Sequence, residues 1–328
     1  MSAVQPADRH VPQHRELAVA RTRLLGLTVA ELRMAIEVPP ELRWRWPAGP
    51  LERFASSADS AHVHVGVRVG RTESPAADAL RYDSGGGIFD VAQLGRDWVI
   101  ALRVQGRLQR LARFDAGFRS GEVVIDPESF YARERHYPLA YPLDEVIFLH
   151  RLAHEGGLLL HACGAVRGRE ALLFSGPSGA GKTTIARLLL ATPGVRVLSD
   201  DRIAIRPTES GFRAYGTPWH GDAPLSLSDS ASLRAIHLIH HAWGIEAEPL
   251  GGAAGAAAVL GNSFAPFHDP ISTERTLDLA ARLAARVPIL RLGFPKDGRV
   301  NSFAWGPQAR AGLEGVSAGS APCVPPAP

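Results

Sequence analysis

Hydrophobic positions in the first 140 residues recur mainly with a period of two. Between Ala61 and Arg71, four valines alternate with other residues, which is typical of a strand with one buried face. Nearer the N-terminus, the segment Leu17–Ile36 is expected to be a helix. The pattern predicts a mainly antiparallel β domain over residues 1–140, with further strands at Asp97–Gln105, Arg107–Phe114 and Gly121–Ile125.

After Pro142 the hydrophobic spacing becomes helical, and a helix is predicted over Pro142–His154, ending at Gly156–Gly157. Strands and helices then alternate, which indicates a second domain of the α/β class over residues 141–307. Residues 251–258 are expected to form a loop or a loose helix, and residues 308–328 a disordered tail. The other predicted elements are strands at Leu158–Val166, Ala171–Phe174, Val195–Ser199, Leu233–Ile239 and Pro288–Leu292, and helices at Lys182–Leu190 and Ser272–Ala285.

Composition narrows the class of protein. Of 328 residues, 45% are hydrophobic and 21% are charged, as in a folded domain. The net charge is +3 and the arginines form no dense run, so a nucleic-acid partner is not expected. No apolar stretch reaches the roughly 18 residues that a membrane helix needs, and residues 1–14 lack the apolar core of a signal peptide. With two cysteines in unrelated contexts, a cytoplasmic location is predicted.

Residues 176–183 match the phosphate-loop motif G-x-x-x-x-G-K-[ST] between a predicted strand and a predicted helix. Glycines let backbone N–H groups turn inward around phosphates. The chain has 34 arginines and two lysines, yet the motif carries a lysine, whose compact ammonium fits between phosphate oxygens. We therefore expect ATP and Mg²⁺ as ligands, with Thr183 on the metal. The predicted nucleotide-binding residues are Gly176, Pro177, Ser178, Gly179, Ala180, Gly181, Lys182, Thr183 and Thr184.

Two neighbouring features could act on the bound phosphate. The predicted strand at Val195–Ser199 is followed by Asp200 and Asp201, and carboxylates at a strand end can bind Mg²⁺ or accept a proton. An ordinary polar turn is the alternative. His161 interrupts an apolar run, and it is either a buried core histidine or a group that orients a carboxylate.

These motifs, in this order and spacing, resemble the catalytic domain of HPr kinase/phosphorylase and its HPr-kinase-related relatives, over roughly residues 145–300. The resemblance implies an α/β fold like that of phosphoenolpyruvate carboxykinase. It also implies that His161 assists catalysis, that Lys182 contacts the transferred phosphate, and that one aspartate of the pair accepts a proton, with Asp201 favoured. Asp200 and Asp222 are candidate magnesium ligands, although the loop at residues 216–222 is as well explained by simple packing.

The chain also departs from the family. Its Glu-containing motif after the aspartate pair is not recognisable, and residues 1–140 do not resemble the usual N-terminal domain. The resemblance therefore implies a kinase acting on a serine hydroxyl of a peptide or protein, rather than on HPr itself, and is compatible with a homo-oligomer. The alternatives are a nucleotide-binding regulatory or scaffold module and a small-molecule kinase.

Overall fold

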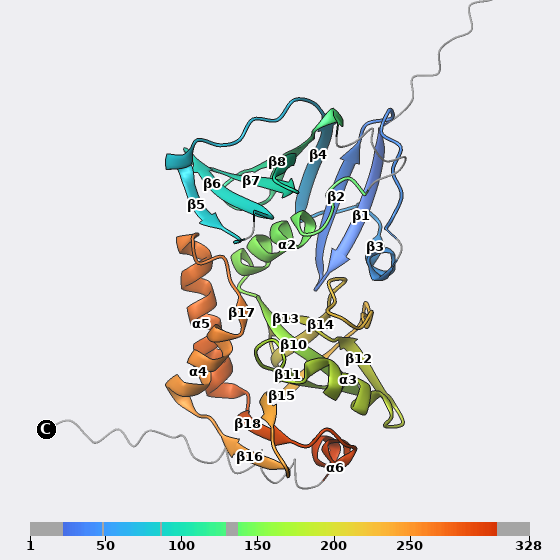
Figure 1. Cartoon of the computed structure of the whole chain (residues 1–328), viewed down its shortest axis with the longest axis vertical. Coiled ribbons are helices and arrows are strands. Elements are labelled where there is room, and N and C mark those ends of the chain that lie inside the picture. The colour runs from blue at the N-terminus through green and yellow to red at the C-terminus, as the bar shows by residue number, and fades with distance from the viewer. Residues whose placement is uncertain (1–21, 48, 86, 129–136, 307–328) are drawn as a thin grey trace, which may run out of the picture.

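The computed structural model describes residues 22–47, 49–85, 87–128 and 137–306. These residues form two large sheets and five helices, α2 to α6, so the α/β class is confirmed (Figure 1). None of these helices has the length and hydrophobicity to cross a membrane. The more specific kinase fold and the domain division at residue 140 stay predictions, and the predicted tail lies outside the described residues.

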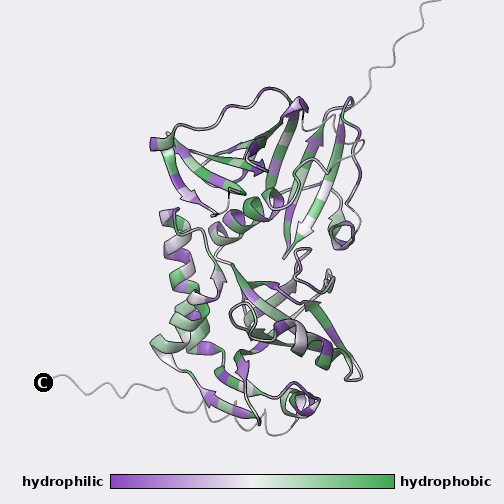
Figure 2. Cartoon of the chain, viewed as in Figure 1, coloured by the Kyte–Doolittle hydropathy of each residue, from purple (hydrophilic) through white to green (hydrophobic). Residues whose placement is uncertain are grey.

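The first sheet has nine strands in the order β3-β1-β2-β4-β9-β8-β7-β6-β5. All its pairings are antiparallel except β2–β4 and β4–β9, so the mainly antiparallel prediction is confirmed. Hydrophobic and hydrophilic bands alternate along its strands, as a half-buried sheet requires (Figure 2). The strands are β1 (Arg23–Val29), β2 (Leu32–Val38), β3 (Ala55–Ser56), β4 (Val63–Val69), β5 (Leu80–Asp83), β6 (Phe89–Leu94), β7 (Asp97–Val104), β8 (Arg107–Phe114) and β9 (Ser120–Ile125), with short 3₁₀ turns at Pro50–Phe54 and Ala77–Ala79.

The helix predicted at Leu17–Ile36 is wrong over its described part, which begins at residue 22. Strands β1 and β2 form an antiparallel hairpin there, with Val29 paired to Leu32. The turn uses Ala30 and Glu31, both with positive φ, 49° and 64°. Every second residue is buried from Leu25 to Val29 and from Leu32 to Val38, and this period of two prevails over a composition rich in helix formers.

The second sheet holds the candidate site. Its strands β11, β10, β13, β14 and β15 are paired in a closed ring, because β11 also pairs in parallel with β15. Strand β18 extends the sheet in parallel from β15. The strands are β10 (Leu158–Arg167), β11 (Glu170–Ser175), β12 (Val195–Ser199), β13 (Arg202–Thr208), β14 (Gly211–Gly216), β15 (Ser230–His241), β16 (Glu246–Pro249), β17 (Ser263–Phe264) and β18 (Ile289–Phe294).

Helices cover both faces of the second sheet. On one face α4 and α5 bury Val259, Leu279 and Leu283 against the strands, and on the other α3 and α6 bury Ile185 and Val300. Helix α2 contributes instead to a core shared with the first sheet (Figure 1). The helices are α2 (Leu143–His154), α3 (Lys182–Leu190), α4 (Gly252–Gly261), α5 (Pro270–Arg286) and α6 (Arg299–Trp305), so residues 252–258 are helical rather than a loop.

Histidines with little exposed surface join α2 to the segment before α5. His150 donates from Nδ1 to the Val146 carbonyl oxygen at 2.7 Å, so its Nε2 accepts, and His268 Nε2 lies 2.8 Å from it. Next to this pair, His154 Nε2 and Asp269 Oδ2 are 2.6 Å apart. Burial lowers the pKa of His150 to about 3 and that of His268 to about 4. Both imidazoles are therefore neutral at pH 7.

This pair predicts that the protein loses stability on mild acidification. Above pH 6.5 these imidazoles are neutral whether folded or unfolded. Between pH 6.5 and about 4, His150 and His268 bind protons in the unfolded chain but stay neutral in the folded protein. The free energy of unfolding therefore decreases as the pH is lowered through this range. The slope is up to about 1.4 kcal/mol per pH unit for each histidine. The lowered pKa of Asp269, about 2, acts only below this window.

Urea unfolding between pH 7.5 and 4.5 checks this prediction. His268→Gln keeps a hydrogen-bonding side chain but cannot titrate, so its stability should depend less steeply on pH. Because His64 is exposed, His64→Gln is the matched control and should behave as the wild type. Equal slopes for His268→Gln and the wild type would contradict this account of the buried pair.

Candidate functional site

The phosphate-loop motif occupies the turn between β11 and α3. The strand ends at Ser175 and the helix begins at Lys182. Gly179 and Gly181 have φ of 82° and 105°, a region that favours glycine. Gly181 is also tightly packed, since a Cβ there would lie 2.9 Å from Phe294 Cζ. Residues 177–179 are exposed at the tip, so the loop is accessible to a ligand.

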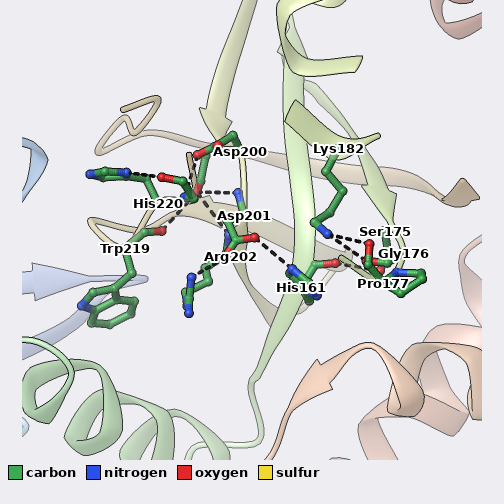
Figure 3. Close-up of polar contacts among 12 residues, drawn as sticks. His161, Ser175, Gly176, Pro177, Lys182, Asp200, Asp201, Arg202, Trp219 and His220 are labelled. Atoms are coloured by element: carbon green, nitrogen blue, oxygen red, sulfur yellow. Dashed lines mark hydrogen bonds and ion pairs between the residues drawn. The ribbon is translucent and has the colours of Figure 1, made fainter. Parts of the chain in front are cut away.

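Lys182 points back into this loop rather than into solvent. Its Nζ donates to the carbonyl oxygens of Gly176 and Pro177, at 2.9 and 3.1 Å (Figure 3). Burial lowers the pKa of Lys182, while the carboxylate of Asp201 acts in the opposite direction. The loop therefore holds a partly desolvated ammonium, and phosphate oxygens could replace the two carbonyl partners.

Thr183 and Thr184 form the first turn of α3, where both are partly buried. Backbone N–H groups at this end of the helix lack intrahelical partners and favour an anion. The Thr183 hydroxyl directly follows Lys182, so it suits the predicted contact with a magnesium ion bound to the phosphates. Their assignment to nucleotide binding stays a prediction.

His161 and Asp201 form a pair beside the loop. His161 lies on β10 and Asp201 follows β12, and His161 Nε2 is 2.9 Å from Asp201 Oδ1 (Figure 3). Burial tends to raise the pKa of Asp201. The hydrogen bond from His161 and the positive charges of Arg202 and Lys182 outweigh it and hold that pKa below its usual value. Asp201 is thus an ionised carboxylate, and it lies close enough to Lys182 for each group to shift the pKa of the other.

Arg202 extends this pair into a network that the sequence did not predict. Its guanidinium donates to Asp201 and to Glu145 of α2, and lies 4.8 Å from the centre of the Phe264 ring. Burial raises the pKa of Glu145, and the charge of Arg202 opposes that rise. The only local sequence signal is the position of Arg202 directly after the aspartate pair, because Glu145 lies 57 residues away along the chain.

Asp200 faces away from this network. Its Oδ1 accepts from Gly221 N and its Oδ2 from Ala223 N, both at 3.0 Å, and its side chain is buried (Figure 3). Both oxygens thus hold the loop after β14. This arrangement favours a structural role for Asp200 over the predicted magnesium ligation.

Asp200→Asn should therefore affect stability rather than metal binding. An asparagine offers one oxygen and one NH₂ group, so one of the two backbone N–H donors would lose its acceptor. The expected cost is roughly 1–3 kcal/mol. Thermal melting and titration with Mg–ATP measure the two effects separately. A normal melting temperature with lost magnesium dependence would instead support the ligand role.

Asp222, the other candidate magnesium ligand, is exposed next to Gly221. Over the described parts of the chain, His, Cys, Asp and Glu side chains form no group of three or more that could hold a metal ion. Mg²⁺ in phosphate-loop sites commonly takes one or two protein oxygens, with phosphates and water completing its shell.

Of the site residues predicted from the sequence, the structure brings His161, Lys182 and Asp201 close together from separate segments of the chain.

No protein-family model and no curated protein matches this chain.

Proposed function

We propose that this protein is a magnesium-dependent kinase that transfers the γ-phosphate of ATP to a hydroxyl group, with a serine of a peptide or protein as the acceptor. The observation that carries the proposal is the 2.9 Å contact between His161 and the ionised Asp201, next to the ammonium of Lys182 in a phosphate loop. The resemblance to HPr-kinase-related proteins supports the same activity and a phosphoenolpyruvate-carboxykinase-like fold, and is compatible with a homo-oligomer. The two cysteines in unrelated contexts support a cytoplasmic location.

In this proposal the loop grips the phosphates. Lys182 exchanges the carbonyl oxygens of Gly176 and Pro177 for oxygens of the β- and γ-phosphates. Backbone N–H groups of the loop and of the first turn of α3 bind the remaining oxygens. Mg²⁺, held by the Thr183 hydroxyl and the phosphates, would neutralise charge on the β- and γ-phosphates.

Asp201 then receives the acceptor's proton. The hydroxyl oxygen forms a bond to the γ-phosphorus while the bond from that phosphorus to the β,γ-bridging oxygen breaks, and ADP leaves. The hydroxyl proton passes to the carboxylate of Asp201. His161 and Arg202 each donate to one of its oxygens, which fixes the carboxylate. Each carboxylate oxygen has a second lone pair, so Asp201 can still accept a bond from the incoming hydroxyl.

One observation favours the competing proposal of a regulatory module that binds a nucleotide without transferring phosphate. Both oxygens of Asp201 already have partners, and Arg202 ties the residue to Glu145 of α2. In the competing proposal, the carboxylate of Asp201 has a purely structural role in this network and joins α2 to the second sheet. In that case His161 and Asp201 are structural.

Phosphate transfer separates the two proposals. The purified protein is incubated with Mg²⁺, ATP labelled at the γ-phosphate, and either serine-containing peptides or host-cell proteins. A kinase labels an acceptor, and mass spectrometry then locates the phosphate on a hydroxyl side chain. A regulatory module binds the nucleotide but leaves every acceptor unlabelled, and that result would overturn the kinase proposal.

A further inference from the structure

Trp243 is an aromatic side chain that the fold leaves uncovered. It is 97% exposed and lies in the turn between β15 and β16. Its backbone is held, since Arg299 donates from Nη2 to the Trp243 carbonyl oxygen at 3.3 Å and also pairs with Asp297. An exposed aromatic ring leaves its apolar faces in contact with water, and a flat partner that stacks on the ring removes those faces from water, which is favourable.

The end of β15 reaches the phosphate loop. Strand β15 runs parallel to β11 with Leu238 opposite Ser175, so its last residues lie beyond the end of β11, where the loop begins. A Cβ placed on Gly181 would lie 3.0 Å from His241 Cε1. The imidazole of His241 is therefore in contact with the last glycine of the loop.

His241 and the backbone of Trp243 lie on the same face of the second sheet. A Cβ placed on Gly293 of β18 would meet both His240 and Ala242, so these two residues share the opposite face. Side chains of an extended chain alternate between faces. His241 therefore lies on the face of the sheet that carries the phosphate loop and α3. Trp243 lies in a bend beyond the end of β15, where its carbonyl oxygen accepts from Arg299 of α6, and α6 packs together with α3 on this same face.

The order of the strands fixes which end of a nucleotide this edge would meet. Strand β11, which leads into the loop, lies between β10 on one side and β15 on the other. His161, on the β10 side, pairs with Asp201, so the terminal phosphate points there in the proposed reaction. The nucleoside end then points toward β15 and β18.

We infer that Trp243 and His241 form a stacking platform for the base of the bound nucleotide, an inference that rests on the proposed function. Lys296, the second lysine of the chain, is exposed just after β18 at this same edge. Stacking on an aromatic face does not require a particular base edge, because every base has a π-face. The platform therefore accepts ATP and GTP alike.

Comparing ATP with inorganic tripolyphosphate tests the inference, because tripolyphosphate has the phosphates but no base. In calorimetric titrations with Mg²⁺ present, Trp243→Ala should bind ATP roughly 5- to 100-fold more weakly than the wild type. Its affinity for tripolyphosphate should be unchanged. Trp243→Phe should retain most of the affinity for ATP. Phe267→Ala removes an exposed aromatic side chain elsewhere and is the matched control, with both affinities unchanged.

The outcomes separate this inference from the proposed function. If Trp243→Ala binds ATP as tightly as the wild type, the stacking platform is overturned while the phosphate site stands. If that variant instead breaks up an oligomer without changing ATP affinity, a second copy of the chain covers the indole, and the inference again fails. If the wild type binds neither probe, the phosphate site is absent and both proposals fall.

Discussion

Asp201→Asn is expected to slow phosphoryl transfer by roughly 10²- to 10⁴-fold, the range that a positioned general base contributes. The amide cannot take up the hydroxyl proton, and it removes a negative charge from beside Lys182. The substitution changes no atom of the phosphate loop, and His161 can still bond to the amide oxygen. The affinity for Mg–ATP should therefore stay within a few-fold of the wild-type value. Turnover with a labelled acceptor and calorimetric binding measure the two effects.

Asp229→Asn is the matched control, because Asp229 pairs with Arg196 at the surface, away from the loop. Its transfer rate should equal that of the wild type. Unchanged turnover in Asp201→Asn would remove Asp201 from the mechanism. A loss of folding in Asp201→Asn, seen as an early thermal transition, would instead show that the network with His161 and Arg202 is structural.

Lys182→Ala should weaken binding of Mg–ATP by about 30-fold or more, because losing one partner of a buried charged contact typically costs 2–5 kcal/mol. The fold should survive, since the substitution removes an ammonium whose burial is itself unfavourable, as its lowered pKa shows. Calorimetric titration gives the affinity, and thermal melting reports the stability.

Two further variants sharpen this prediction. Arg187→Ala removes a cation from the exposed face of the same helix and should leave the affinity unchanged. Lys182→Arg should fail to restore it, because a planar guanidinium does not fit the space between the Gly176 and Pro177 carbonyls and the phosphates. Wild-type affinity in Lys182→Ala would contradict the role of the loop.

Elements with strong periodicity could be predicted from the sequence. The valine alternation in β4 and the helical stripe of α2 are local signals, and the structure confirms both. The composition of the β1–β2 hairpin favours a helix, and its turn, Ala30–Glu31, lacks the Gly or Asn that usually marks positive φ, so the local sequence predicts the wrong element. The strand pairings that close the ring through β11 and β15 join distant segments, so no local pattern reveals them.

The same distinction applies to the candidate site. The phosphate loop is a contiguous motif, so its conformation follows from its glycines. The pairing of His161 with Asp201 spans 40 residues, and it was suggested only by resemblance to a family with the same order of motifs. The part played by Glu145 depends on how α2 packs, and that of Asp200 on backbone donors of a later loop. No local sequence pattern around Glu145 or Asp200 indicates these contacts.

Calorimetric titration of the wild-type protein with ATP, with and without Mg²⁺, tests the central claim most directly. If Lys182 and its loop bind a triphosphate, saturable binding of ATP should appear with Mg²⁺ and weaken greatly when the metal is chelated. The absence of any magnesium-dependent affinity for ATP or GTP would contradict the account.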